Sequence, residues 1–135
     1  MNILVIDAKG GGMGRQLVSS IKQNFQKATV MAVGTNATAT FAMNKAGADI
    51  SGTGENSVVV ASRKADIIVG PIGIVIADSM LGEVTPRMAA AVGQSGAKLV
   101  LIPFNYCESI IVGVGDRTPS ELIAEAMEVL RGMIG

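Results

Sequence analysis

Short, continuously apolar runs alternate with longer amphipathic segments along most of the chain. Such runs are typical of parallel strands that helices cover on both faces. A fifth run lies only a few residues after the fourth, so an antiparallel orientation is compatible with it. The predicted strands are Asn2–Asp7, Thr29–Gly34, Asp66–Gly70, Lys98–Pro103 and, as the fifth, Ser109–Val114.

The amphipathic segments between these runs predict helices. Two of their starts carry clear capping signals. Thr118-Pro119-Ser120-Glu121 has the spacing of a capping box with proline at the first helical position, and Thr85-Pro86 has the cap and the proline without the acid. The predicted helices are Met13–Asn24, Ala37–Ala46, Glu55–Ser62, Ile72–Leu81, Pro86–Gln94 and Pro119–Met133.

Strands that alternate with helices predict an α/β fold. We expect a three-layer, doubly wound, Rossmann-like sandwich whose sheet is mostly parallel and has four to five strands, with right-handed crossovers. Residues 1–135 contain no repeat, linker or low-complexity segment, so we expect one domain over the whole length.

Composition narrows the class of protein. Eleven basic and eleven acidic residues give a formal net charge of zero, and only 3% of residues are aromatic. A nucleic-acid surface would normally show a basic patch or aromatic rings for base stacking, so we expect no nucleic-acid partner. The chain has no histidine, which excludes a histidine general base and a histidine-based metal site.

The expected compartment is the cytoplasm. Cys107 is the only cysteine, so no intrachain disulfide can form, and a Cys–His nucleophile is excluded as well. The first residues enter a strand pattern without a basic leader. The longest nearly uncharged apolar stretch, Ile67–Ala77, is too short to span a membrane and contains Gly70, Pro71 and Gly73.

A glycine-rich turn joins the first predicted strand to the first predicted helix. Its residues are Gly10, Gly11, Gly12, Met13 and Gly14, directly after Asp7-Ala8-Lys9. Strand, glycine turn and helix build phosphate sites in parallel sheets, because the free N–H groups at the helix start attract anions. We therefore expect this turn to bind a phosphate. The alternative is a turn required only for tight helix–strand packing.

The turn departs from two known nucleotide motifs. The dinucleotide fingerprint places glycines at relative positions 1, 3 and 6, and Lys9 stands where the first glycine belongs. Read as a phosphate loop, the turn ends in Gly14-Arg15-Gln16, where Gln16 replaces the magnesium-binding hydroxyl. NAD(P) or another nucleotide remains open as the cofactor, and an NTPase is the weaker reading.

Other candidate ligand contacts follow the ends of the neighbouring strands, where ligands bind in open α/β sheets. Thr35 and Asn36 follow the second strand, where dinucleotide folds carry an acid for the ribose; Asn36 could instead cap the next helix. For the segment after the third strand, an ordinary strand–helix turn is the competing interpretation. The candidates after the third and fourth strands are Gly70, Pro71, Gly73 and Asn105.

Three carboxylates could carry chemistry. Asp7 closes the first strand and Asp78 lies within the predicted Ile72–Leu81 helix, so either could act as acid or base on a bound phosphometabolite. Together with Glu83 they could hold a divalent metal, although we predict no metal site. Thr53 and Glu55 could contact ligand or only cap a helix.

The chain resembles a small bacterial family of unknown function. Nearly the whole length takes part, and the quite specific motifs are Asp7 with Gly10–Gly14, Val33-Gly34-Thr35-Asn36, Ala46-Gly47-Ala48-Asp49, Gly52-Thr53-Gly54-Glu55-Asn56, Gly70–Ser79, Gly82-Glu83-Val84-Thr85-Pro86 and Met88–Ser95. The resemblance implies a stand-alone Rossmann-like protein and no particular reaction.

Three functions stay open from sequence. The first is a cytoplasmic protein that binds a nucleotide or dinucleotide through Gly10–Gly14. The second is a small enzyme that acts on a phosphorylated metabolite. The third is a regulatory or binding module without catalysis, a homodimer or higher homo-oligomer, whose partner surface would be the apolar Ile72–Leu81 segment.

Overall fold

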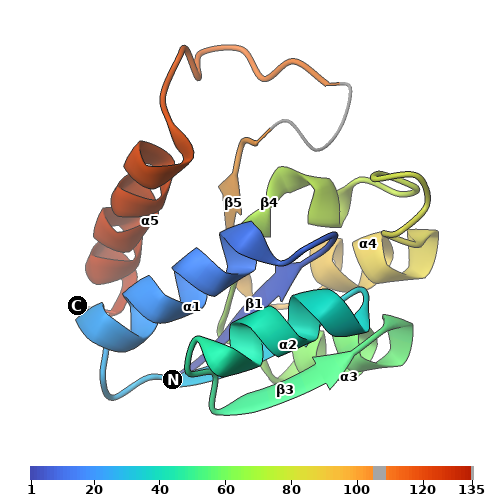
Figure 1. The fold of residues 1–135 in the computed structure, drawn as a ribbon, viewed down its shortest axis with the longest axis horizontal. Coiled ribbons are helices and arrows are strands. Elements are labelled where there is room, and N and C mark those ends of the chain that lie inside the picture. The colour runs from blue at the N-terminus through green and yellow to red at the C-terminus, as the bar shows by residue number, and fades with distance from the viewer. Residues whose placement is uncertain (105–108, 135) are drawn as a thin grey trace.

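The structure is a computed structural model that describes residues 1–104 and 109–134 (Figure 1). One sheet of five parallel strands forms its middle layer. The strands are β1 (Asn2–Asp7), β2 (Thr29–Gly34), β3 (Ile50–Thr53), β4 (Ile67–Pro71) and β5 (Lys98–Ile102). The helices are α1 (Gly12–Asn24), α2 (Ala37–Lys45), α3 (Glu55–Lys64), α4 (Pro86–Gly93) and α5 (Pro119–Ile134), with a short 3₁₀ helix η1 (Ile72–Val75) after β4.

The strand order is β3-β2-β1-β4-β5. From β1 the chain first builds outward through β2 to β3, then crosses to the other side of β1 to form β4 and β5. The order therefore reverses between β1 and β4, whose pairing includes Ile3 with Ile67 and Val5 with Val69. Ligands of open α/β sheets bind beyond the carboxyl ends of the strands at such a switch point.

Each face of the sheet has its own apolar core. Along β1, Ile3 and Val5 face α1, α2 and α5, whereas Leu4 and Ile6 face α3, α4 and the segment after β4. This alternation follows from the two-residue period of a strand. All four side chains are buried, so both faces are covered. The expected three-layer, parallel, Rossmann-like fold is confirmed.

The prediction of a strand at Ser109–Val114 is wrong. These residues form irregular turns, and Ile110 and Val112 are 91% and 94% exposed. The true fifth strand is β3, whose sequence Ile50-Ser51-Gly52-Thr53 is mostly polar. β3 is a short edge strand with exposed side chains, so no apolar run marks it. The apolar pattern missed β3 because such a pattern reflects the burial of side chains, and an exposed edge strand does not require it.

The predicted helix Ile72–Leu81 is also wrong. Only η1 is helical, and turns follow it up to the start of α4. Three non-glycine residues of this segment, Asp78, Met80 and Leu81, have left-handed φ angles of 64°, 57° and 57°. A right-handed helix cannot contain such residues, and the Ser79 hydroxyl instead bonds the Gly73 carbonyl at 2.7 Å.

Candidate functional site

The glycine turn between β1 and α1 is built partly for packing. Gly11 has a left-handed φ of 75°, and a Cβ atom there would lie 2.8 Å from Cα of Ala39. A Cβ atom on Gly14 would lie 2.7 Å from Cβ of Asp7 and 2.6 Å from Sδ of Met43. Both distances are shorter than real contacts allow. The close approach of α1 to β1 and α2 therefore explains Gly11 and Gly14.

Packing does not explain the other two glycines. Gly10 and Gly12 are exposed, and a Cβ atom on either would meet nothing within 4 Å. Gly12 and Met13 are the first residues of α1, and within the described residues their N–H groups donate no hydrogen bond. Free N–H groups at the start of a helix attract anions. The exposed part of the turn thus keeps the features of an anion site.

Asp7 ties the end of β1 to the first turn of α1. Its side chain is 1% exposed, and its two carboxylate oxygens accept hydrogen bonds from the N–H groups of Ala8 at 2.8 Å and Gly14 at 2.6 Å. Burial raises the pKa of Asp7; the two hydrogen bonds oppose this, and the nearby charge of Glu83 adds to it. With both oxygens bonded to backbone, Asp7 acts first as an internal anchor for the helix.

Glu83 joins three segments that are far apart in the sequence. Its Oε1 atom accepts hydrogen bonds from the Lys9 N–H at 2.6 Å, the Thr35 hydroxyl at 2.6 Å and the Asn36 amide at 2.5 Å. Burial raises the pKa of Glu83, but these hydrogen bonds and the charge of Lys9 outweigh it, and the pKa lies below its ordinary value. The loop that follows β4 is thereby fastened over the ends of β1 and β2.

Thr35 and Asn36 are both part of this arrangement. The Thr35 N–H donates to the Asp7 carbonyl at 3.0 Å, which continues the ladder between β1 and β2. Asn36 accepts from the Ala39 N–H at 2.9 Å, so its expected role as the cap of α2 is confirmed. Its amide also donates to the Lys9 carbonyl at 2.9 Å. The two residues hold the glycine turn from the β2 side.

Gly70, Pro71 and Gly73 are buried where β4 passes into η1. A Cβ atom on Gly70 would lie 2.5 Å from the Ile6 carbonyl oxygen, and one on Gly73 would lie 2.8 Å from Cε of Met80. Close contacts with β1 and with the following loop explain these two glycines. Their predicted role as ligand contacts stays a prediction.

The remaining candidates are scattered. Asp78 is exposed in a left-handed turn, not enclosed in a helix as expected. The Thr53 hydroxyl donates to Oγ1 of Thr40 at 2.7 Å, and Glu55 lies 3.8 Å from Arg87, so neither side chain caps α3. Asn105 and Cys107 lie outside the described residues.

The metal alternative has no geometric support. Among residues 1–104 and 109–134, no three carboxylate or thiol side chains gather where they could hold a metal ion. Asp7, Asp78 and Glu83 therefore do not form the ligand set that their sequence allowed. Glu83 is the residue whose role the sequence reasoning missed, because its partners lie 47 to 74 residues away and no local motif marks them.

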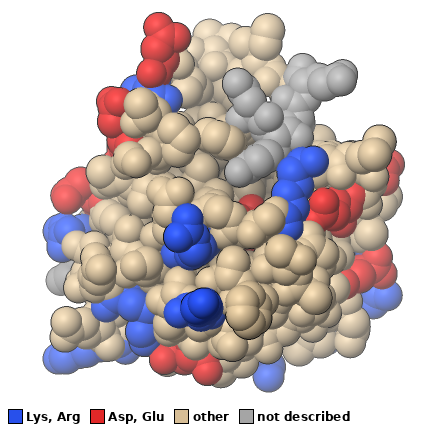
Figure 2. All heavy atoms as spheres, in the orientation of Figure 1, with Lys and Arg blue, Asp and Glu red and all other residues tan. Residues whose placement is uncertain are grey.

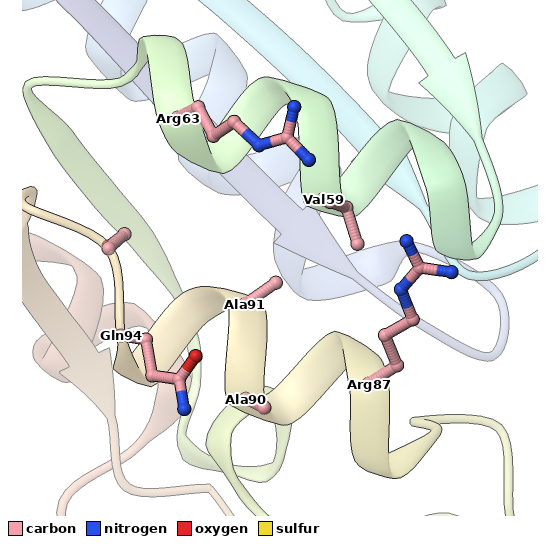
Figure 3. Close-up of a pocket in the computed structure, with 7 residues that line it drawn as sticks. Val59, Arg63, Arg87, Ala90, Ala91 and Gln94 are labelled. Atoms are coloured by element: carbon pink, nitrogen blue, oxygen red, sulfur yellow. The ribbon is translucent and has the colours of Figure 1, made fainter.

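Two surface hollows lie away from this site. A groove of about 680 Å³ runs between α1 and α2, with Arg15, Phe41 and Lys45 among its lining residues. On the face that carries these helices, Lys and Arg stand in separate groups with Asp and Glu around them (Figure 2). A hollow of about 320 Å³ lies between α3 and α4, where Arg63 and Arg87 project beside a floor that includes Ala91 (Figure 3).

Comparison with solved structures finds a protein of similar fold. The chain is similar to a dodecameric FMN-dependent UbiX-like decarboxylase from Escherichia coli O157:H7, with a TM-score of 0.54 and 15% sequence identity. The match covers 100% of this chain and 95% of that one. At this identity the likeness shows a common fold. Comparison with curated protein sequences gives no match.

Two further findings concern membrane-spanning helices and family membership. Within the described residues, no helix has both the length and the apolar character needed to cross a lipid bilayer. A family model matches residues 2–134, which is nearly the whole chain. The resemblance to an uncharacterised Rossmann-like family is thus confirmed, and this chain belongs to the family described as a domain of unknown function, DUF3842.

Proposed function

We propose that this protein binds a small ligand with a phosphate group, a nucleotide or a phosphorylated metabolite, at the switch point between β1 and β4. The phosphate would lie on the exposed part of the glycine turn. The observation that carries the proposal is the start of α1. There, the Gly12 and Met13 N–H groups have no acceptor among residues 1–104 and 109–134, and Gly10 and Gly12 leave the backbone uncovered. Backbone amides at a helix start suit an anion.

FMN is the first nucleotide to test. The similar E. coli protein is an FMN-dependent UbiX-like decarboxylase and has a common fold with this chain. NAD(P) fits less well, because the end of β2 carries Thr35 and Asn36 where dinucleotide folds place a ribose-binding acid. When bound, a flavin would supply redox or group-transfer chemistry. In this chain, Gly12 and Met13 would bind its phosphate.

The fit has one electrostatic limit. Asp7 already occupies the Gly14 N–H, and Glu83 already occupies the Lys9 N–H. Within the part of the chain that the structure describes, the N–H groups of Gly10, Gly12 and Met13 donate no hydrogen bond, so these remain available to a phosphate, beside two carboxylates. Because like charges in close proximity repel, the site favours a ligand that also gains contacts away from its phosphate.

The test is thermal unfolding with FMN, NAD(P) and adenine nucleotides at saturating concentration. A ligand that binds only the folded state raises the Tm as its concentration rises above its Kd. Gly12→Ala should weaken binding of the active nucleotide about tenfold or more, because the new methyl group keeps phosphate from the backbone. Gly132→Ala on α5 is the matched control, since its methyl group also meets nothing within 4 Å. Unchanged Tm values with every nucleotide would refute the proposal.

We also propose that the protein forms a homo-oligomer. Ile110 and Val112 are almost fully exposed, and Ile111 between them is 37% exposed. Exposed apolar side chains of this size mark interaction surfaces when they gather. Light scattering on the wild type and on an Ile110→Asp/Val112→Asp double variant tests this. A monomeric wild type at micromolar concentration would contradict it.

A further inference from the structure

The loop that joins η1 to α4, residues 76–85, crosses the switch point. Figure 1 shows this loop between η1 and α4. It reaches the ends of β1 and β2, because Glu83 accepts hydrogen bonds from Lys9, two residues after β1, and from Thr35, directly after β2. A ligand at the start of α1 would therefore meet this loop. The side chain of Glu83 is the part of the loop that lies against the glycine turn.

The loop has two buried anchors and an exposed tip. Val84 and Met80 are buried in the core that faces α3 and α4, and the Asp78 N–H donates to the Val84 carbonyl at 2.8 Å. Leu81 and Gly82, between these anchors, are exposed. Within the described residues, only Glu83 connects this part of the loop by side-chain hydrogen bonds to the residues that follow β1 and β2.

The tip and the residues before it are held in a conformation that their sequence disfavours. Asp78, Met80 and Leu81 adopt left-handed φ angles, which non-glycine residues avoid because Cβ crowds the following carbonyl. Leu81 is fully exposed, so no burial of its side chain offsets this strain. A strained backbone persists only where neighbouring contacts enforce it. The three hydrogen bonds to Glu83 are contacts of this kind.

We propose that residues 81–83 form a gate over the switch point, that Glu83 latches it closed, and that an oxyanion ligand opens it by displacing the Glu83 carboxylate from the Lys9 N–H. Lys9 to Met13 carry both the N–H group that holds Glu83 and the free N–H groups that would hold phosphate. The phosphate and the Glu83 carboxylate would bind different N–H groups of this short stretch, but they would lie side by side and repel each other. Ligand binding and latching therefore oppose each other. This inference rests on the proposed function and adds its regulation.

Amide hydrogen exchange tests the latch without any ligand. In Glu83→Ala and Glu83→Gln, amides of residues 81–83 and of Lys9 should exchange about tenfold faster or more, the factor that follows from losing one charge-assisted hydrogen bond. Amides of the buried strand β1 should keep their wild-type rates. Glu128→Gln makes the same chemical change on the exposed face of α5 and should alter none of these rates. Unchanged loop exchange in both Glu83 variants overturns the proposal.

Inorganic phosphate then tests the competition. Isothermal titration should show that Glu83→Gln binds phosphate about tenfold more tightly than the wild type, and phosphate should speed loop exchange in the wild type. Equal phosphate affinity in the wild type and both variants overturns the gate while the proposed function stands. Faster loop exchange with no binding of phosphate or of any nucleotide supports the latch and refutes the proposed function.

Discussion

Gly14→Ala tests whether the approach of α1 to β1 is as close as the structure shows. The added Cβ atom would lie 2.7 Å from Cβ of Asp7, which the backbone of β1 fixes, and 2.6 Å from Sδ of Met43, which can move. Overpacking of this kind costs about 1–3 kcal/mol. Displacement of the helix would also lengthen the 2.6 Å bond from the Gly14 N–H to Asp7.

One effect opposes this loss. Alanine is more favourable than glycine within a helix by about 1 kcal/mol. We expect a net loss of about 1–3 kcal/mol in the free energy of unfolding, because the steric term and the weakened charge-assisted bond together exceed the gain in propensity. For a chain of this length each kcal/mol shifts the Tm by about 3–5 °C.

Urea unfolding followed by circular dichroism measures the change, with Gly12→Ala as the control. Gly12 is also in α1, but its Cβ atom would meet nothing within 4 Å, so this variant should be as stable as the wild type or slightly more stable. The reasoning is refuted if Gly14→Ala unfolds at the same urea concentration as Gly12→Ala. That result would mean that β1 and α1 lie further apart.

Two more predictions concern single residues. Burial raises the pKa of Asp7 above 3.8, so its contribution to stability is full below that pH and is lost as the pH rises through the folded-state pKa. Asp7→Asn removes this pH dependence. The free energy of unfolding of Asp7→Asn minus that of the wild type should therefore increase as the pH rises from below 3.8 to neutral. A difference that stays constant with pH would argue against a buried, ionisable Asp7. Leu81→Gly should raise stability by about 0.5–1 kcal/mol, because a left-handed leucine costs about 1–2 kcal/mol and glycine loses part of this to chain entropy. A loss of stability on urea unfolding of Leu81→Gly would show that the leucine makes a contact that its full exposure excludes.

Local patterns predicted most of the framework. The apolar runs predicted β1, β2, β4 and β5 to within a residue, since β1, β2 and β4 are almost wholly buried and β5 is partly buried. The Thr85 cap of α4 formed as its sequence indicates. Errors arose where apolar character does not coincide with burial in the sheet. Ser109–Val114 is largely apolar but exposed, and β3 is mostly polar but pairs with β2.

Some features of the candidate site also follow from local sequence, and others depend on the tertiary structure. The sequence by itself determined the glycine turn after β1 and the cap of α2, because both depend on residues a few positions apart. Only the tertiary structure decided which glycines packing requires and where Glu83 lies. Glu83 meets Lys9 across 74 residues because the strand order brings β4 beside β1. No local propensity encodes such a contact; it exists only once the sheet is assembled.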